Sequence, residues 1–169
     1  NIGFLMLKDA QQVPKILKLL SGSFNAHVRY GATLALGISC AGTCNADALK
    51  ILEPMTNDPV DYVRQGAFIA TSMVLQQATV AQEPKVEKFR TQLDDIMAKK
   101  HEDPLVRLGV LLSKGILDAG GRNARISLLS QFGYPKLEAC AGMVVFTQFW
   151  YWFPLIHFFP LTLSPSCLI

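Results

Sequence analysis

The sequence predicts an all-α protein, an α-solenoid segment of stacked, HEAT-like helical hairpins that could carry a small β cap near its C-terminal end. Two observations predict this fold class. A Val-Arg-x-Gly pattern occurs three times, with 35 and then 43 residues between successive arginines. The residues after each copy are small and apolar without strict alternation, which indicates buried helix rather than strand. Because a repeat period of about 20–50 residues is typical of solenoids, the three copies indicate stacked units.

The repeated positions share a residue type and a register. Each arginine is followed two residues later by a glycine and, six residues beyond that glycine, by a second small residue. Glycine inside a helix costs about 1 kcal/mol relative to alanine, so its return at one register implies that neighbouring helices must approach closely. The predicted structural repeat positions are Arg29, Gly31, Gly37, Arg64, Gly66, Arg107, Gly109 and Gly115, with Ser72 in place of the second glycine of the middle unit.

The first half of the chain divides into a truncated repeat, residues 1–22, and a full repeat, residues 23–59. Within the full repeat, residues 31–40 are expected to form the first helix and residues 46–55 the second. Asn45 is expected to cap the second helix, because its short side chain can accept a hydrogen bond from the free backbone N–H groups of the first turn.

A further repeat is expected over residues 60–103, and its long second helix spans about residues 84–100. Apolar residues recur in that helix at i, i+3, i+7, i+10 and i+11, which is the pattern of an amphipathic helix: they are Val86, Phe89, Leu93, Ile96 and Met97. The first helix of the last repeat covers residues 104–121. It begins at Asp103-Pro104 and ends at Gly120-Gly121.

Residues 122–169 form an aromatic closing segment that is uncharged from Ala139 onward, and half of the 16 aromatic residues lie between positions 146 and 159. Composition leaves two interpretations open. Residues 139–163 are long enough to span a bilayer, which takes about 20 residues, or they form a helix buried against the repeats. Residues 126–129 and 166–169 are expected to pair as short strands.

Charge and cysteine content exclude several classes of protein. A net charge of +3 from 16 basic and 13 acidic residues is too small for a nucleic-acid-binding protein. The four cysteines lack the spacing of a zinc site or of a disulfide scaffold, so reduced and mostly buried thiols are expected. Nothing in the sequence implies a cofactor or a metal.

No catalytic constellation stands out, so the sequence predicts a protein without enzymatic activity. The three histidines, His27, His101 and His157, lie far apart and beside no nucleophile. The paired acids Asp94-Asp95 are expected on a solvated helix face rather than in an acid–base pair. The recurring arginines could form a basic ladder for an acidic partner, but ion pairs with acids of the neighbouring unit are the stronger expectation.

The Gly-Ala-rich units with their Val-Arg-x-Gly start resemble proteasome/cyclosome repeats, the helical hairpins of the two large scaffold subunits of the proteasome regulatory particle. Three stretches are similar to the larger of these subunits: His27–Ala32, Leu52–Pro59 and Gly115–Gly121. The aromatic stretch Phe146–Trp150 is similar as well, so the resemblance covers almost the whole chain.

The resemblance implies that the chain is a fragment of a toroid of about eleven repeats, whose centre the closing segment would plug. It implies a non-catalytic scaffold, cytoplasmic and nuclear, that holds ubiquitin receptors and neighbouring lid and ATPase subunits, with no nucleic acid and no membrane. The family's receptor anchor lies in an extreme C-terminal tail, so receptor docking is not assigned to these residues. Two alternatives stay open: an adaptor or transport solenoid of the HEAT type, and a helical protein anchored in a membrane by residues 139–163.

Overall fold

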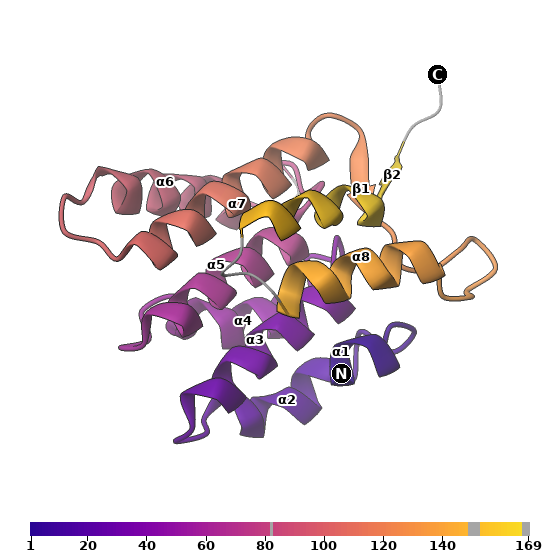
Figure 1. Ribbon diagram of the computed structural model, residues 1–169, viewed down its shortest axis with the longest axis horizontal. Helices are drawn as coiled ribbons and strands as arrows, with labels where there is room; N and C mark the ends of the chain where they lie inside the picture. Colours follow the sequence, from indigo (N-terminus) through magenta and orange to yellow (C-terminus); the bar gives the residue numbers. More distant parts are fainter. Residues whose placement is uncertain (82, 149–152, 167–169) are drawn as a thin grey trace.

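A computed structural model describes residues 1–81, 83–148 and 153–166 of the chain. Three helices run side by side and form the inner row of a short solenoid (Figure 1): α3 (Ala26–Ser39), α5 (Asp61–Leu75) and α7 (Pro104–Gly120). Each packs on the next, α3 on α5 and α5 on α7. The outer row consists of α2 (Val13–Ser21), α4 (Ala46–Met55) and α6 (Lys85–Ala98), and the short α1 (Ile2–Leu5) lies against α3. The all-α, solenoid-like fold class is therefore confirmed.

Local capping explains where several helices begin. The side chain of Asn45 accepts hydrogen bonds from the backbone N–H groups of Asp47 and Ala48, as expected, and α4 has the predicted bounds. Helix α3 begins earlier than expected because Asn25 caps it, accepting from His27 N at 2.9 Å. Asp103 caps α7 in the same way.

The main core lies between the two rows of helices. Leu36 of α3, Phe68 of α5 and Leu52 of α4 are fully buried there, together with Leu93 of α6. The amphipathic stripe predicted for α6 accounts for this: Val86, Phe89, Leu93 and Ile96 are all buried. Helices α3 and α5 are buried over most of their length and therefore show weak amphipathicity, since a helix buried on most sides has no polar face to spare.

The closing segment lies across the inner row and forms a second core with it (Figure 1). It consists of α8 (Leu137–Gln148) and the 3-10 helix η1 (Phe153–Thr162), which pack on each other. Met143 and Phe146 of α8 are buried against Met73 of α5, and the Phe146 ring lies 4.9 Å from that of Phe159. The aromatic residues at positions 149–152 lie outside the described residues.

The β cap exists, but its strands are not the expected ones. Strand β1 (Ala124–Ile126) pairs antiparallel with β2 (Leu163–Pro165), in the register Ala124↔Pro165. Residues 128 and 129 were expected in the first strand. Instead, the Leu128 side chain is buried and its carbonyl accepts from Lys136 N at 2.8 Å, so these residues close the loop before α8. Of the expected partner strand, Ser166 donates to Asn123 O, and residues 167–169 lie outside the described residues.

None of the helices within the described residues is long and apolar enough to cross a membrane. Helix α8 has 12 residues, whereas a spanning helix needs about 20.

Candidate functional site: the repeated arginines and glycines

Arg29 and Asp58 form a bidentate ion pair between two successive inner helices. From α3, Arg29 Nε donates to Asp58 Oδ2 at 2.7 Å and Nη2 donates to Oδ1 at 2.9 Å. The remaining nitrogen, Nη1, donates to the backbone carbonyls of Ser23 and Phe24. Asp58 precedes α5 and also accepts from Val60 N at 2.9 Å. The pair thus joins the start of α3 to the start of α5.

The environment of Asp58 favours its ionised form. Burial raises the pKa of this carboxyl group, but the hydrogen bonds from Arg29 and from Val60 N, together with the charges of Arg29 and Arg64, outweigh burial and hold the pKa below its ordinary value. The hydrogen bond to Asp58 in turn raises the pKa of Arg29. With side chains only 15% and 9% exposed, this pair is screened less than a surface salt bridge.

Arg64 occupies the equivalent position on α5 and makes equivalent contacts. Its Nη1 donates to the backbone carbonyls of Asp58 and Pro59, and its Nη2 donates to Asp61 Oδ1 at 2.6 Å. The same nitrogen reaches Glu102 Oε1 at 3.1 Å, and Glu102 lies just before α7. Arg29 and Arg64 therefore each pair with an acid at the start of the following inner helix, and this geometry favours the ion-pair interpretation over a free basic ladder.

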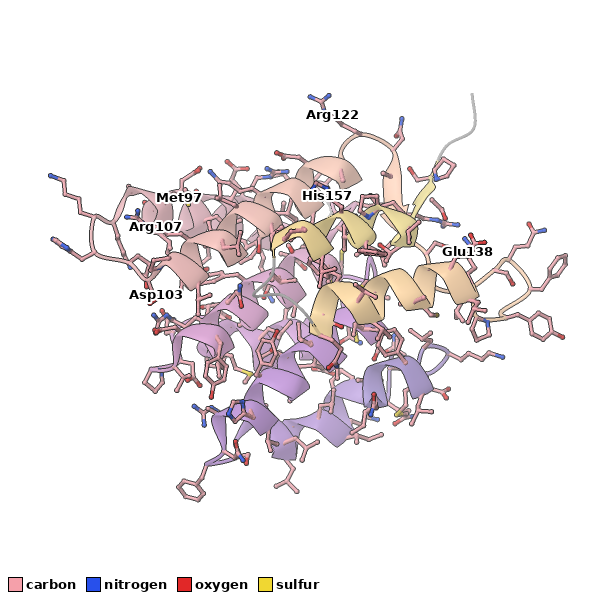
Figure 2. The ribbon with its side chains drawn as sticks, viewed as in Figure 1. Met97, Asp103, Arg107, Arg122, Glu138 and His157 are labelled. Atoms are coloured by element: carbon pink, nitrogen blue, oxygen red, sulfur yellow. The ribbon has the colours of Figure 1, made fainter. Side chains whose placement is uncertain are left out.

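Arg107, the third repeated arginine, lies at the α6–α7 end of the molecule, near Asp103 (Figure 2). One of its guanidinium nitrogens donates to the Lys99 carbonyl. Within the described ranges it has no acidic partner, and its Nε is enclosed without an acceptor. No further helix of the inner-row type follows α7 in the described chain, so the acid that the pattern would supply is missing.

Three of the repeated glycines lie where a neighbouring helix comes close. A Cβ at Gly37 would lie 2.8 Å from Ala70 Cα, a backbone atom of α5. At Gly66 a Cβ would lie 2.7 Å from the Tyr30 ring of α3, and at Gly109 it would lie 2.6 Å from Gln65 Cγ of α5. Such separations are shorter than carbon–carbon contact distances of about 3.5–4.0 Å. At these positions the absence of a side chain sets the helix–helix distance.

Gly31 and Gly115 differ from the other three repeated glycines. A Cβ at either position would meet no atom within 4 Å among the residues that the structure describes. Both are exposed: Gly31 lies beside Ile2 and Leu17 in an open hollow, and Gly115 borders a hollow between α7 and η1.

The sequence did not predict the contacts of two residues, Gly142 and Gln76. Gly142 of α8 touches η1, where a Cβ would lie 2.6 Å from the Phe158 carbonyl oxygen. Gln76 is fully buried, and its side chain accepts from Ile126 N at 2.7 Å and donates to the Ile116 carbonyl. Neither residue belongs to the repeat pattern, and no sequence signal distinguishes them from other glycines and glutamines.

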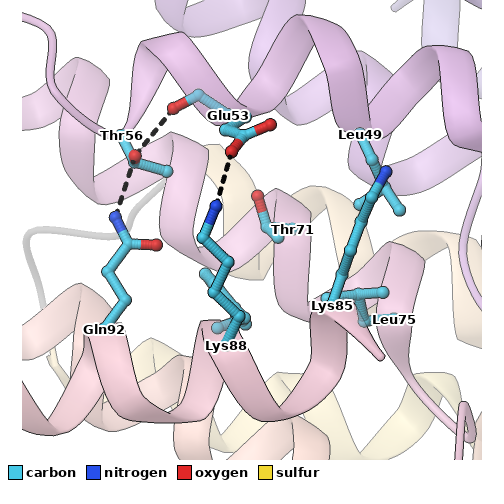
Figure 3. Close-up of a pocket in the computed structure, with 9 residues that line it drawn as sticks. Leu49, Glu53, Thr56, Thr71, Leu75, Lys85, Lys88 and Gln92 are labelled. Carbon is cyan, nitrogen blue, oxygen red and sulfur yellow. Dashed lines mark hydrogen bonds and ion pairs between the residues drawn. The ribbon is translucent and has the colours of Figure 1, made fainter. Parts of the chain in front are cut away.

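A cleft between the outer helices α4 and α6 is shown in Figure 3. Lys88 pairs with Glu53 across it at 3.2 Å, and Gln92 donates to Thr56 Oγ1 at 3.1 Å. The Lys88 and Glu53 side chains are 78% and 66% exposed, so they do not form a desolvated acid–base pair. Within the described ranges no cluster of His, Cys, Asp or Glu is arranged to hold a metal ion.

The described cysteines are free thiols. Cys40 is buried, and burial raises its pKa to about 11, which keeps it protonated and unreactive at neutral pH. Cys44 and Cys140 are partly buried, and burial raises the pKa of both. Cys167 lies outside the described residues.

Comparison with known proteins places this geometry in a family. Residues 31–65 match the family model of the proteasome/cyclosome repeat. The chain is 52% identical over 168 residues to the 26S proteasome non-ATPase regulatory subunit 1 homolog B of Arabidopsis thaliana. It is 49% identical over 169 residues to the 26S proteasome non-ATPase regulatory subunit 1 of Drosophila melanogaster.

The chain carries the proteasome/cyclosome repeat. Its similarity to the 26S proteasome regulatory subunit RPN2 of Saccharomyces cerevisiae is 44% identity over 169 residues. Each of these alignments covers 99% of the chain but only 17–18% of the relative, so the chain spans about one sixth of the length of the curated relatives it matches.

The matched repeat coincides with one period of the geometry described above. It begins at Gly31, includes α4 and its cap, and ends at Gln65, directly before the next repeated glycine. One family repeat therefore extends from one inner helix to the equivalent point of the next, and it contains Asp58, the acid that joins the two.

Gln65 of α5 carries a buried amide group whose hydrogen-bonding capacity is unused, and its cost to stability can be measured. Its side chain is fully buried beside Gly109, and neither its Oε1 nor its Nε2 has a hydrogen-bond partner in the part of the chain that the structure describes. We expect Gln65→Met to raise the free energy of unfolding by about 1 kcal/mol, because an unsatisfied buried polar group costs roughly 1–3 kcal/mol. Chemical denaturation of the 169-residue chain measures this change.

Gln76 provides the matched control, since it is equally buried but hydrogen-bonded at both ends of its amide. Gln76→Met should lower the free energy of unfolding by about 1–3 kcal/mol, because Ile126 N would lose its acceptor. Equal effects of the two substitutions would contradict this account.

Proposed function

We propose that this chain is part of a non-catalytic scaffold subunit of the proteasome regulatory particle, and that the whole subunit holds neighbouring lid and ATPase subunits and ubiquitin receptors during ubiquitin-dependent protein degradation. The observation that carries the proposal is 44–52% identity, over 99% of the chain, to subunits whose names place them in the 26S proteasome as regulatory and non-ATPase. Operation in both cytoplasm and nucleus is part of the same proposal.

The geometry of the repeats supports a mechanical role. The inner helices are joined by partly buried ion pairs and by glycine contacts that admit no side chain, and such a stack presents its outer surfaces in a fixed relation to one another. The charged pair in the cleft between α4 and α6, Lys88 and Glu53, is largely exposed to solvent, which supports binding by surface complementarity over chemistry on a substrate.

The test is native affinity purification of the polypeptide as the cell makes it, in moderate salt, followed by mass spectrometry. We expect recovery of proteasome ATPase and lid subunits at comparable stoichiometry. Recovery of the polypeptide alone, or only in detergent with membrane proteins, would overturn the proposal. Enzymatic turnover that persists after separation from all other subunits would overturn its non-catalytic part.

A further inference from the structure

Ser164 and Pro165 of β2 form the only serine–proline or threonine–proline pair in the chain. The other prolines follow a valine, an acid or an aromatic residue. A residue before proline is biased toward extended backbone, and Ser164 lies in a strand. Proline-directed protein kinases select this dipeptide in extended segments, so Ser164 has the local sequence of a phosphorylation site.

The β cap presents Ser164 on its polar face. Ile126 of β1 and Leu163 of β2 belong to the second core. Because side chains alternate along a strand, their neighbours Arg125 and Ser164 lie on the opposite face. These two residues are paired directly across the strands, which places their side chains next to each other. Ser164 is half-buried, whereas Arg125 and Pro165 are exposed.

A lysine reaches this face without an acid to neutralise it. Lys136 Nζ donates to Ser127 Oγ at 2.9 Å and to Ser164 Oγ at 3.0 Å. Both acceptors are uncharged hydroxyl groups, so the ammonium charge is not compensated. The ion pairs formed by the described residues include neither Lys136 nor Arg125. The fold thus gathers two cations without carboxylate partners beside one hydroxyl group.

We propose that Ser164 is a phosphorylation site whose phosphate group is held by Lys136 and Arg125. A proline-directed kinase transfers the terminal phosphoryl group of ATP to Ser164 Oγ. The new Oγ–P bond forms as the bond from the γ-phosphorus to the bridging oxygen breaks, ADP leaves, and the hydroxyl proton passes to the kinase's aspartate base. The product places about two negative charges where an ammonium group already lies within hydrogen-bond distance of Ser164 Oγ.

The phosphate ties together three parts of the closing segment. Arg125 belongs to β1, Ser164 to β2, and Lys136 directly precedes α8. A two-stranded sheet is marginally stable on its own, so β2 can separate locally to enter a kinase. After transfer, charge-assisted hydrogen bonds from the two cations hold β2 against β1 and against the start of α8. This inference does not depend on the proposed scaffold role.

Phosphorylation of the polypeptide as the cell makes it tests the site. The purified protein is dephosphorylated, the phosphatase is removed, and a mitogen-activated protein kinase and ATP are added before mass spectrometry locates the phosphate. We expect phosphate at Ser164, none there in Ser164→Ala, and about tenfold slower incorporation in Pro165→Ala. Ser166→Ala is the matched control, because this exposed serine precedes a cysteine, and it should leave incorporation at Ser164 unchanged. An unmodified Ser164, when a standard peptide substrate is fully phosphorylated, would overturn the proposal.

Hydrogen exchange tests the role of the two cations. Phosphorylation should slow exchange in a peptide over residues 124–127 about tenfold, which corresponds to roughly 1.4 kcal/mol, because Ser127 N donates to Thr162 O just before β2. The double variant Arg125→Gln, Lys136→Met should lose this slowing, and Lys15→Met, at an exposed lysine of α2, should keep it.

Each protein is compared with its own unphosphorylated form, so a weakened fold in the double variant does not count as a loss of the effect. Slowing of the same size in the original chain and the double variant would overturn the role of Arg125 and Lys136. Phosphorylation of the original chain without any slowing would overturn the claim that the fold holds the phosphate.

Discussion

Replacing Gly37 by alanine is expected to lower the free energy of unfolding of the 169-residue chain by about 1–3 kcal/mol, the usual cost of forcing an extra methyl group into a packed interior. The new methyl would meet backbone and side-chain atoms of Ala70 at 2.8–2.9 Å, so α3 and α5 would have to separate. Backbone atoms cannot move aside as the end of a flexible side chain can.

Gly31→Ala on the same helix is the matched control. No atom of another described segment lies within 4 Å of the new methyl, and alanine is the better helix former, so this substitution should raise the free energy of unfolding by up to about 1 kcal/mol. Chemical denaturation measures both variants, and hydrogen exchange of the α3 and α5 amides shows whether the loss is local to their contact. If both glycines respond alike, the close approach at Gly37 does not determine the stacking.

Asp58→Asn is expected to lower the free energy of unfolding by about 2 kcal/mol, because it removes the charge that faces a largely buried guanidinium. Removal of one partner from a fully buried pair costs roughly 3–5 kcal/mol, and the partial exposure of Arg29 reduces that figure. The matched control is Asp47→Asn, whose carboxylate is 68% exposed in a pair with Lys50 and should contribute under about 0.5 kcal/mol.

The same substitution should change the pH dependence of stability. The pKa of Asp58 is lower in the folded chain than in the unfolded one, where it is about 3.9. Its contribution is therefore complete above the unfolded pKa and is lost as pH falls through the folded pKa. As pH falls below the unfolded pKa and toward the lower folded pKa, the original chain should lose stability faster than the Asp58→Asn variant. The measurement is the free energy of unfolding of both proteins as a function of pH. Parallel curves for the original chain and the variant would show that Asp58 is not held ionised by its partners.

The sequence by itself determined which segments form helices and where several of them begin. The bounds of α4 follow from Asn45, the bounds of α7 from Asp103-Pro104 and Gly120, and the buried face of α6 from its apolar spacing. These features depend on residues within about one turn of each other, because a cap or an amphipathic stripe is a local property. The recurring Val-Arg-x-Gly pattern likewise shows the register of the repeat in the sequence alone.

The tertiary structure alone decided how the repeated positions are used. Gly37 and Gly31 look alike in sequence, yet only Gly37 lies where another helix crosses. Arg107 looks like Arg29 in sequence, yet among the described residues Arg29 has an acidic partner and Arg107 has none. Ile126 N of β1 donates to the side chain of Gln76, which is 50 residues away in sequence. Contacts of this kind depend on where one helix crosses another. The spacing of residues within a single helix does not encode the position of that crossing.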